Sequence, residues 1–143
     1  MSKGNTFETD IVGLIFNATA IANISDNAAS SPLTSLYVGL HTADPGEGGS
    51  QTTSESAYGS YARVAVARTS GGWTVASGTA SNTALIQFPE CTSGSETITY
   101  VSIGTASSGT GKILYSGALT ASRAISSGIQ PQFAAAALVV TED

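Results

Sequence analysis

The chain is 143 residues long, which is the size of one ordinary domain. Only 10% of its residues are charged, against about 25% in an average soluble protein. Ten acidic and five basic residues give a net charge of −5, which argues against a protein that binds duplex DNA through a basic surface. One histidine and one cysteine exclude a disulfide framework and a multi-histidine metal centre. The composition therefore points away from an enzyme.

The first feature along the chain is an amphipathic stretch over residues 7–16, which predicts a helix. Asn5 and Glu8 have the spacing of a capping box at its start. Four apolar side chains recur at helical spacing and share one face: Phe7, Ile11, Leu14 and Ile15. Val12 and Phe16 widen this face beyond what a surface helix needs. Two alternatives follow: the helix packs on the protein's own sheet, or its extra apolar width docks on a neighbouring subunit.

Residues 17–31 are predicted to form a loop of small side chains, after which the hydrophobic period changes to two. Alternating stretches bounded by glycine- or proline-containing turns predict strands over residues 36–41, 61–68, 73–75, 84–88, 97–103, 112–119, 124–125 and 132–141. In the last stretch the alanines favour helix, but the β-branched residues that follow them favour strand. Seven or eight short antiparallel strands and one N-terminal helix predict a mainly β protein, an antiparallel β-sandwich or a barrel-like variant of it.

Two parts of the chain are predicted. Residues 1–35 form an N-terminal helix and loop that could serve as an anchoring segment, and residues 36–143 form the β-sandwich domain. Within the domain, turn residues and a polar stretch predict an exposed loop over residues 44–60. The longest apolar run, residues 133–140, is far shorter than the roughly 20 residues that span a bilayer. No secretory signal follows Lys3, so we expect a soluble chain made in a cytoplasm, with no membrane partner.

Residues with catalytic or metal-binding chemistry are few. His41 and Asp44 are the right types for a base and its orienting carboxylate, but no Gly-x-Ser-x-Gly nucleophile motif accompanies them. Asp44, Glu47 and Glu55 lack the spacing of a calcium loop. Residues 106–113 resemble a phosphate loop, but the first glycine and the magnesium-holding hydroxyl are missing. We therefore expect no catalytic residues, no metal and no cofactor.

Two binding alternatives rest on aromatic residues. The first is single-stranded nucleic acid, for which one stretch offers aromatic and basic side chains: Tyr61, Arg63, Arg68 and Trp73. Two arginines in an acidic chain give too weak a field, so no nucleic-acid partner is expected. The second is a carbohydrate-binding module, for which Trp73 with Tyr58 and Tyr61 is the candidate group. Trp73 is expected either to cover one end of the core or to stand exposed at an interface.

The predicted strands are poorly protected at their edges. Soluble proteins defend strand edges with lysine, proline or bulges, yet the chain has two lysines and neither lies in the interior of a predicted strand. A strand protein of this composition is best suited to an assembly in which partners cover its edges. The single cysteine, Cys91, is expected to be a small buried apolar residue.

Several short stretches occur in a recognisable order. They are LHTADPG (40–46), YARVAV (61–66), SN (81–82), FP (88–89), TITY (97–100), LYSGAL (114–119) and FAAAAL (133–138). Together they resemble small structural proteins of tailed bacteriophages, over about residues 36–141. Such proteins are labelled tail-fibre, minor virion or capsid decoration proteins. The resemblance implies membership of a structural class and carries no catalytic motif, and residues 1–35 lie outside it.

We therefore expect a non-enzymatic virion structural protein. The first choice is a capsid decoration or cement protein on the capsid surface, which binds the assembled shell and stabilises it. The expected partners are the major capsid protein or other virion proteins, and copies of the chain itself as a trimer or dimer. The predicted partner contacts are Phe7, Ile11, Leu14, Ile15 and Trp73. The alternatives are a tail, baseplate or fibre component and, in another class, a carbohydrate-binding β-sandwich module.

Overall fold

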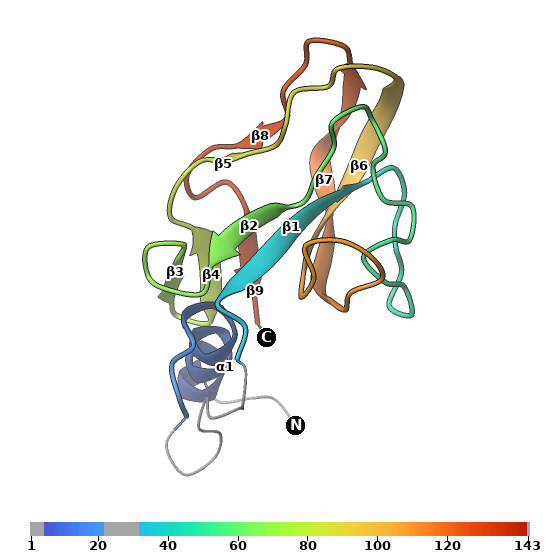
Figure 1. Cartoon of the computed structure of the whole chain (residues 1–143). Helices are drawn as coiled ribbons and strands as arrows, with labels where there is room; N and C mark the ends of the chain where they lie inside the picture. Colours follow the sequence, from blue (N-terminus) through green and yellow to red (C-terminus); the bar gives the residue numbers. More distant parts are fainter. Residues whose placement is uncertain (1–4, 22–31, 143) are drawn as a thin grey trace. The chain divides into compact units, whose positions relative to one another are not determined.

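A computed structural model describes residues 5–21 and 32–142 of the chain (Figure 1). In this part the protein is mainly β, with antiparallel sheets and one N-terminal helix, which confirms the predicted class. The helix is α1 (Asn5–Asn17). The strands are β1 (Ser35–His41), β2 (Val64–Ala67), β3 (Trp73–Ala76), β4 (Thr79–Asn82), β5 (Ile86–Gln87), β6 (Ser95–Gly104), β7 (Ile113–Ser126), β8 (Gln132–Phe133) and β9 (Val139–Thr141). Most of the loop predicted over residues 17–31 lies outside the described residues.

The chain forms two compact units. The first is built from described residues within 1–35, 66–86 and 133–143, and it contains α1 and the three-stranded sheet β3-β4-β9. The second is built from residues 36–65 and 87–132, and it contains most of the four-stranded sheet β2-β1-β6-β7. Strands β2, β5 and β8 lie where the chain passes between units, and β5 pairs with β8. The predicted division at residue 35 into an anchoring segment and a sandwich domain stays a prediction.

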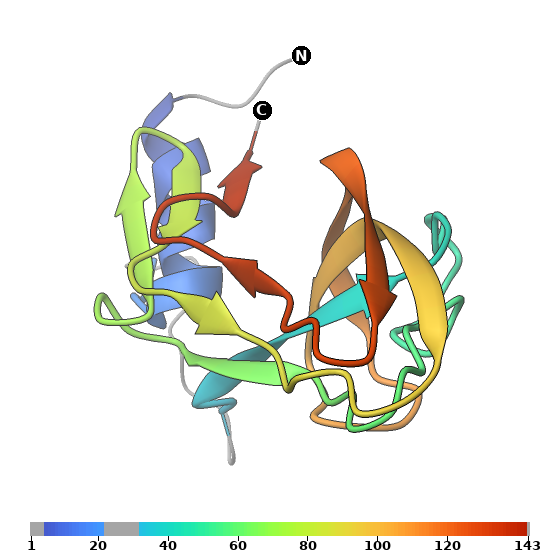
Figure 2. The ribbon, with the colours of Figure 1, turned by 90° about the horizontal axis from the view of Figure 1, so that it is seen from above.

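In the first unit, α1 lies against β3 and β4, as both ribbon views show (Figures 1 and 2). Val12 and Phe16, one helical turn apart, are fully buried. The Phe16 ring meets the Trp73 indole edge-on, with 4.7 Å between ring centroids, and Trp73 is also fully buried. The helix therefore packs on the protein's own sheet through Val12 and Phe16, the two residues at the margin of the predicted apolar face.

The second unit is organised by the antiparallel pairs β1 with β6 and β6 with β7. Strands β2 and β7 are the edges of this sheet, so it is open, and the barrel-like variant does not form in the described chain. The register places Val38 opposite Ile103 and Leu40 opposite Val101. All four side chains are buried, and because directly opposed residues share a face, they form an apolar core on one side of the sheet.

The edge strand β7 pairs irregularly with β6. Its residues 119–122 oppose the single residue Thr99, and Leu114 is an extra residue near its start. Bulges of this kind bend a strand and interrupt its row of hydrogen-bonding groups. The two strands predicted over residues 112–119 and 124–125 are therefore one long irregular strand.

The C-terminal prediction is wrong in one respect. The single strand predicted over residues 132–141 is two short strands, β8 and β9, separated by a turn at residues 134–137. Within this turn Ala136 has a positive φ of 60°, which lies outside the extended backbone of a regular strand and which alanine adopts at a cost. Strand β4, which has the sequence TASN, was not predicted because small polar residues show no apolar alternation.

Asn82, at the end of β4, explains why the predicted strand divides and why a turn forms at residues 134–137. Its side-chain amide donates to the carbonyls of Ala84 and Ala134, at 2.7 and 2.8 Å. Its side-chain oxygen accepts from the Leu138 N–H at 2.9 Å, and its carbonyl accepts from the Ala136 N–H at 2.8 Å. The buried Asn82 therefore forms hydrogen bonds with main-chain groups of Ala134, Ala136 and Leu138. These bonds hold residues 134–137 as a turn and prevent β8 and β9 from joining into one strand.

Arg68 completes the first unit at the C-terminal end of α1. The helix has no basic residue in its last turn, where the unpaired carbonyls carry partial negative charge. The Arg68 guanidinium donates from Nη2 to the Leu14 carbonyl, from Nε to the Ile15 carbonyl and from Nη1 to the Leu33 carbonyl, each at 2.7 Å. A residue 53 positions beyond Ile15 thus provides the positive charge and the donors that the helix end lacks.

We predict that Arg68→Met lowers the free energy of unfolding by about 2–4 kcal/mol, because three charge-assisted hydrogen bonds are lost while the apolar stem is kept. Urea unfolding followed by the fluorescence of Trp73, the one tryptophan of the chain and a residue of the same unit, measures this change. The exposed Arg123 of β7 provides the control, and Arg123→Met should change stability by less than about 0.5 kcal/mol. Equal effects of the two substitutions would contradict this role of Arg68.

Candidate functional site

In the second unit, side chains with acid–base or nucleophilic chemistry gather at the end of β1. We call them the His41 cluster, and its members are His41, Ser102, Glu55, Tyr61 and Arg63. The sheet register pairs Gly39 with Ser102, so that Ser102 lies two positions from His41 on the neighbouring strand. A β-bridge between His41 and Glu55 brings in the segment that leads to β2.

His41 and Ser102 have the geometry of a base and a nucleophile. The Ser102 Oγ lies 2.7 Å from His41 Nε2, and the Thr53 carbonyl oxygen lies 2.8 Å from His41 Nδ1. Because a carbonyl only accepts, Nδ1 carries the proton, and in the neutral ring Nε2 accepts from the Ser102 hydroxyl. This is the arrangement that activates a serine in acyl transfer, with a main-chain carbonyl in place of the orienting carboxylate.

Burial keeps this pair from meeting a substrate. His41 is 0% and Ser102 is 1% exposed. Burial also lowers the pKa of His41, an effect that the hydrogen bond to Thr53 partly offsets, so the ring is neutral at pH 7. Asp44, which the sequence offered as a carboxylate to orient His41, accepts a hydrogen bond from the Gly46 N–H at 2.9 Å, in an exposed turn. The contact between His41 and Ser102 is therefore a structural one in this conformation.

Glu55 and Arg63 form a two-pronged ion pair next to the histidine. Arg63 Nε lies 2.6 Å from Glu55 Oε1 and Nη2 lies 2.7 Å from Oε2, and the two side chains are 2% and 16% exposed. The Tyr61 hydroxyl donates to Glu55 Oε1 at 3.1 Å and accepts from the Leu40 N–H at 3.0 Å. Burial raises the pKa of Tyr61 well above its ordinary value. The Glu55 carboxylate thus accepts hydrogen bonds from both Arg63 and Tyr61, which offsets the cost of removing the ion pair from water.

The cluster holds two loops in place. Arg63 Nη1 donates to the Ala106 carbonyl and Nη2 to the Gly109 carbonyl, each at 2.8 Å. The buried Gln51 adds to this, because its side-chain oxygen accepts from the Ala106 N–H at 2.9 Å and its own N–H donates to the Thr110 carbonyl at 3.1 Å. The chemically reactive groups of the unit thus fix residues 50–56 and 105–111 against each other.

Two sequence predictions are corrected here. The loop predicted over residues 44–60 is exposed around 46–48, but Gln51, Ser56 and Tyr58 within it are buried. The strand predicted over residues 61–68 begins only at Val64, since Tyr61 and Arg63 are held by the His41 cluster. Sequence reasoning missed Gln51 and Ser102. The glycines at 104 and 111 are the one signal for Gln51, because a Cβ at either position would overlap its side chain.

The five predicted partner contacts differ in the surface that they offer. Phe7 is 42% exposed, and Ile11, Leu14 and Ile15 are half-buried along the same helix. Trp73 has no exposed surface and packs on Phe16, so it belongs to the core and offers a partner no direct contact in this structure. Contact of the four helix residues with a partner stays a prediction.

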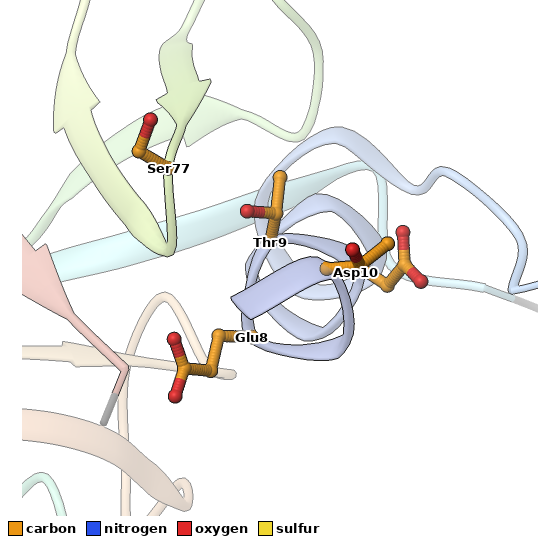
Figure 3. Close-up of a pocket in the computed structure, with 5 residues that line it drawn as sticks. Glu8, Thr9, Asp10 and Ser77 are labelled. Carbon is orange, nitrogen blue, oxygen red and sulfur yellow. The ribbon is translucent and has the colours of Figure 1, made fainter. Parts of the chain in front are cut away.

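A shallow hollow of about 490 Å³ lies at the first turn of α1, lined by Thr6, Glu8, Thr9, Asp10 and Ser77. Figure 3 shows the Glu8 and Asp10 carboxylates pointing in different directions from the helix. Thr9 Oγ accepts a hydrogen bond from the Gly78 N–H at 2.8 Å, which ties the helix to the turn between β3 and β4. Among the described residues no three metal-ligating side chains gather, and no described helix is long and apolar enough to cross a membrane.

We predict that stability depends on pH through His41. The pKa of the folded state is lowered below 6.5, so the unfolded chain binds more protons once the pH falls below 6.5. The free energy of unfolding should therefore decrease as the pH falls from 6.5, by up to about 1.4 kcal/mol per pH unit, and this term should be constant above 6.5. Urea unfolding at pH 5.5 to 7.5 measures the slope. His41→Gln should abolish it, because the chain has one histidine; an unchanged slope would contradict the assignment.

We also predict a strong coupling between Glu55 and Arg63. Arg63→Met should destabilise the fold by about 2–4 kcal/mol, because it leaves the largely covered Glu55 carboxylate without its cationic partner and the Ala106 and Gly109 carbonyls without their donor. The double variant Glu55→Met/Arg63→Met should lose at least about 1 kcal/mol less than the sum of the single variants. Urea unfolding followed by circular dichroism provides the four values of the cycle. Additive effects would show that the pair is not coupled.

Comparison with known proteins identifies the class of the chain. No curated protein matches it. The model of one protein family, described as Podophage GP4 fiber I protein gp80, matches residues 6–141, which include α1 from its second residue and all of the described strands. This match confirms the resemblance to structural proteins of tailed bacteriophages. The chain therefore belongs to the Podophage GP4 fiber I protein gp80 family and is a phage fibre-type virion protein.

Proposed function

We propose that this protein is a non-enzymatic structural subunit of a phage fibre and that it acts through contacts with other virion proteins. The main support is that its potentially reactive side chains are buried and form structural hydrogen bonds. His41, Ser102 and Arg63 are buried and serve to fix two loops, as the hydrogen bonds of the His41 cluster describe. A protein whose acid–base side chains form buried structural hydrogen bonds has a rigid fold, which suits a structural subunit.

The fibre is preferred to the capsid surface. The sequence favoured a decoration protein on the shell, with a tail, baseplate or fibre component as the alternative. The family description names a fibre protein, which supports that alternative. The carbohydrate-binding alternative loses support, because Trp73 and Tyr58, two of its three aromatic residues, are buried.

Helix α1 provides the first contact face in this proposal. Arg68 and the packing of Val12 and Phe16 hold the helix firmly to its sheet. Phe7 and Leu14 lie about half a helical turn around from Val12 and Phe16, at 100° per residue, so they point away from the sheet. A rigid helix that presents the exposed Phe7 suits contact with a neighbouring subunit, since little entropy is lost on binding.

The location is tested by immunogold labelling of intact particles with antibodies raised against the purified chain. We expect gold over the fibres and none over the head. Gold distributed over the shell would support the decoration role instead. Absence of the chain from purified particles, measured by mass spectrometry, would contradict a structural role in the virion.

The contact face is tested by Phe7→Gln in phage complemented with the variant chain. We expect about a tenfold loss of incorporation into particles, which corresponds to about 1.4 kcal/mol of contact energy. The free energy of unfolding should change by less than about 1 kcal/mol, because Phe7 is exposed. Ile129→Gln is the matched control: Ile129 is 44% exposed against 42% for Phe7, but lies in the other unit. Equal incorporation of both variants would contradict the role of α1.

A further inference from the structure

Strand β9 is an outer strand of the sheet β3-β4-β9 and pairs only with β4. On that side the Leu138 carbonyl accepts from the Asn82 N–H at 3.2 Å, and the Glu142 N–H donates to the Gly78 carbonyl at 2.9 Å. Position 140, midway between these contacts, continues the same antiparallel register. Every second residue of the segment therefore directs its main-chain groups toward β4.

The alternate residues, Val139 and Thr141, direct their main-chain groups away from β4. Their two N–H and two C=O groups lie along the free edge of the sheet, and no described residue bonds to them. Val139 is 56% exposed, the highest value among the large hydrophobic side chains of the described chain, and Thr141 is exposed as well. This edge is therefore open in both its backbone and its side chains.

The opposite edge of the sheet, β3, is covered by the chain itself. The Trp73 N–H donates to the Thr69 carbonyl at 2.9 Å, and the Trp73 carbonyl accepts from the Asn17 side-chain amide at 3.1 Å. Asn17 is the last residue of α1, so the end of the helix lies along this edge. The first unit thus covers one edge of its sheet and leaves the other uncovered in the described chain.

Strand β9 also lacks the features that protect a free edge, which are charged side chains, proline and bulges. Its three residues, Val139 to Thr141, are neither charged nor proline, and their register with β4 is continuous. Strand β7, by contrast, has bulges. An edge that is open and regular is suited to the addition of another strand.

The end of this edge is acidic. A Cβ on Gly78 would lie 3.5 Å from a carboxylate oxygen of Glu8 and 3.4 Å from the carbonyl oxygen of Glu142, so these two acidic residues lie near each other at the end of β9. Arg68 is the one basic residue among the described residues of the first unit, and it is bonded to the other end of α1. A lysine or arginine that reaches the end of β9 therefore meets acidic side chains and no cation of this unit.

We propose that β9 binds an extended segment of another virion protein, which adds a fourth strand to the sheet β3-β4-β9. The segment forms hydrogen bonds with the main chain of Val139 and Thr141, packs small or β-branched side chains beside Val139, and places a lysine or arginine near Glu8. Four main-chain groups make a weak contact alone, so the segment binds where other contacts already hold its protein nearby.

The chemistry of the edge selects this occupant. Donors and acceptors that recur on every second residue match another extended strand. The acidic end favours a basic segment over a second copy, because β9 of a second copy brings another Glu142 and no basic residue. The inference rests on the proposed function and specifies the chemistry of one partner, without depending on the contact through α1.

Hydrogen–deuterium exchange of the unmodified chain, free and in purified particles, tests the edge without knowledge of the partner. We expect the Val139 and Thr141 amides to exchange at least about tenfold more slowly in particles, because each gains a hydrogen-bond partner there. Val140 is the control on the same strand, and its amide, which faces β4, should be protected already in the free chain. Unchanged exchange of Val139 and Thr141 in particles would overturn the inference. Equal protection in a concentrated solution of the free chain would identify a second copy as the occupant, which also overturns it.

Thr141→Pro tests the main-chain contact in phage complemented with the variant chain. Proline removes only an outward N–H, a position at which an edge strand tolerates it, so urea unfolding should match that of the unmodified chain. We expect incorporation into particles to fall about tenfold, since proline blocks the added strand. Thr141→Val keeps the N–H and should be incorporated normally. Equal incorporation of the two variants would contradict strand addition at β9.

Glu8→Gln tests the basic residue of the partner. It should reduce incorporation about threefold, the size of an exposed ion pair, whereas Asp10→Asn should leave it unchanged. Both variants remove one charge from the first turns of α1, but the two carboxylates point in different directions (Figure 3). Equal effects would contradict a basic partner at Glu8. The proposed function is measured separately: a chain that labels the fibres while its Val139 and Thr141 amides exchange freely refutes only the strand addition, and a chain absent from particles refutes both.

Discussion

The structure depends on guanidinium groups that donate to main-chain carbonyls. Arg68 does so in the first unit, where it completes the end of α1, and Arg63 does so in the second, where it holds the loop at residues 105–111. A cation that is buried, as Arg63 is, or partly buried, as Arg68 is, needs partners for its charge and its donors. The negative end of a helix matches Arg68, and Glu55 matches Arg63. In a chain with only five basic residues, two of them therefore act as internal supports.

Most of the fold could be predicted from hydrophobic period, because α1, β1 and β6 are long and regular. The rest of the fold depends on contacts between residues far apart in the chain, which hydrophobic periodicity does not reveal. β4 has no apolar pattern and exists because it pairs with both β3 and β9. The last predicted strand divides in two because Asn82, some fifty residues earlier in the chain, binds the turn at residues 134–137. Tyr61 and Arg63 leave the predicted strand because their side chains have buried partners elsewhere.

The candidate site was harder to predict than the fold, since it depends on strand register. The sequence offered Asp44, close to His41, as an orienting carboxylate, and the pair was set aside because no nucleophile motif accompanied it. The actual partner, Ser102, lies 61 residues away and is brought near by the pairing of β1 with β6. The position of Trp73 also depends on contacts that are distant in sequence. A lone tryptophan after two glycines is compatible with either a core or an interface. Its burial against Phe16 follows only from the packing of α1 on the sheet.

The irregular pairing of β7 has a consequence for how copies can associate. The sequence shows few lysines to guard its strand edges, and the structure shows that geometry supplies protection at one of them. The bulges at Leu114 and at residues 119–122 leave no long straight run of free backbone groups along this edge. Strand-to-strand growth, the route to amyloid, is thereby hindered there even though the strand carries a single charged side chain, Arg123. The edge of β7 is in this way less able to pair with a strand of another chain before the protein reaches the particle.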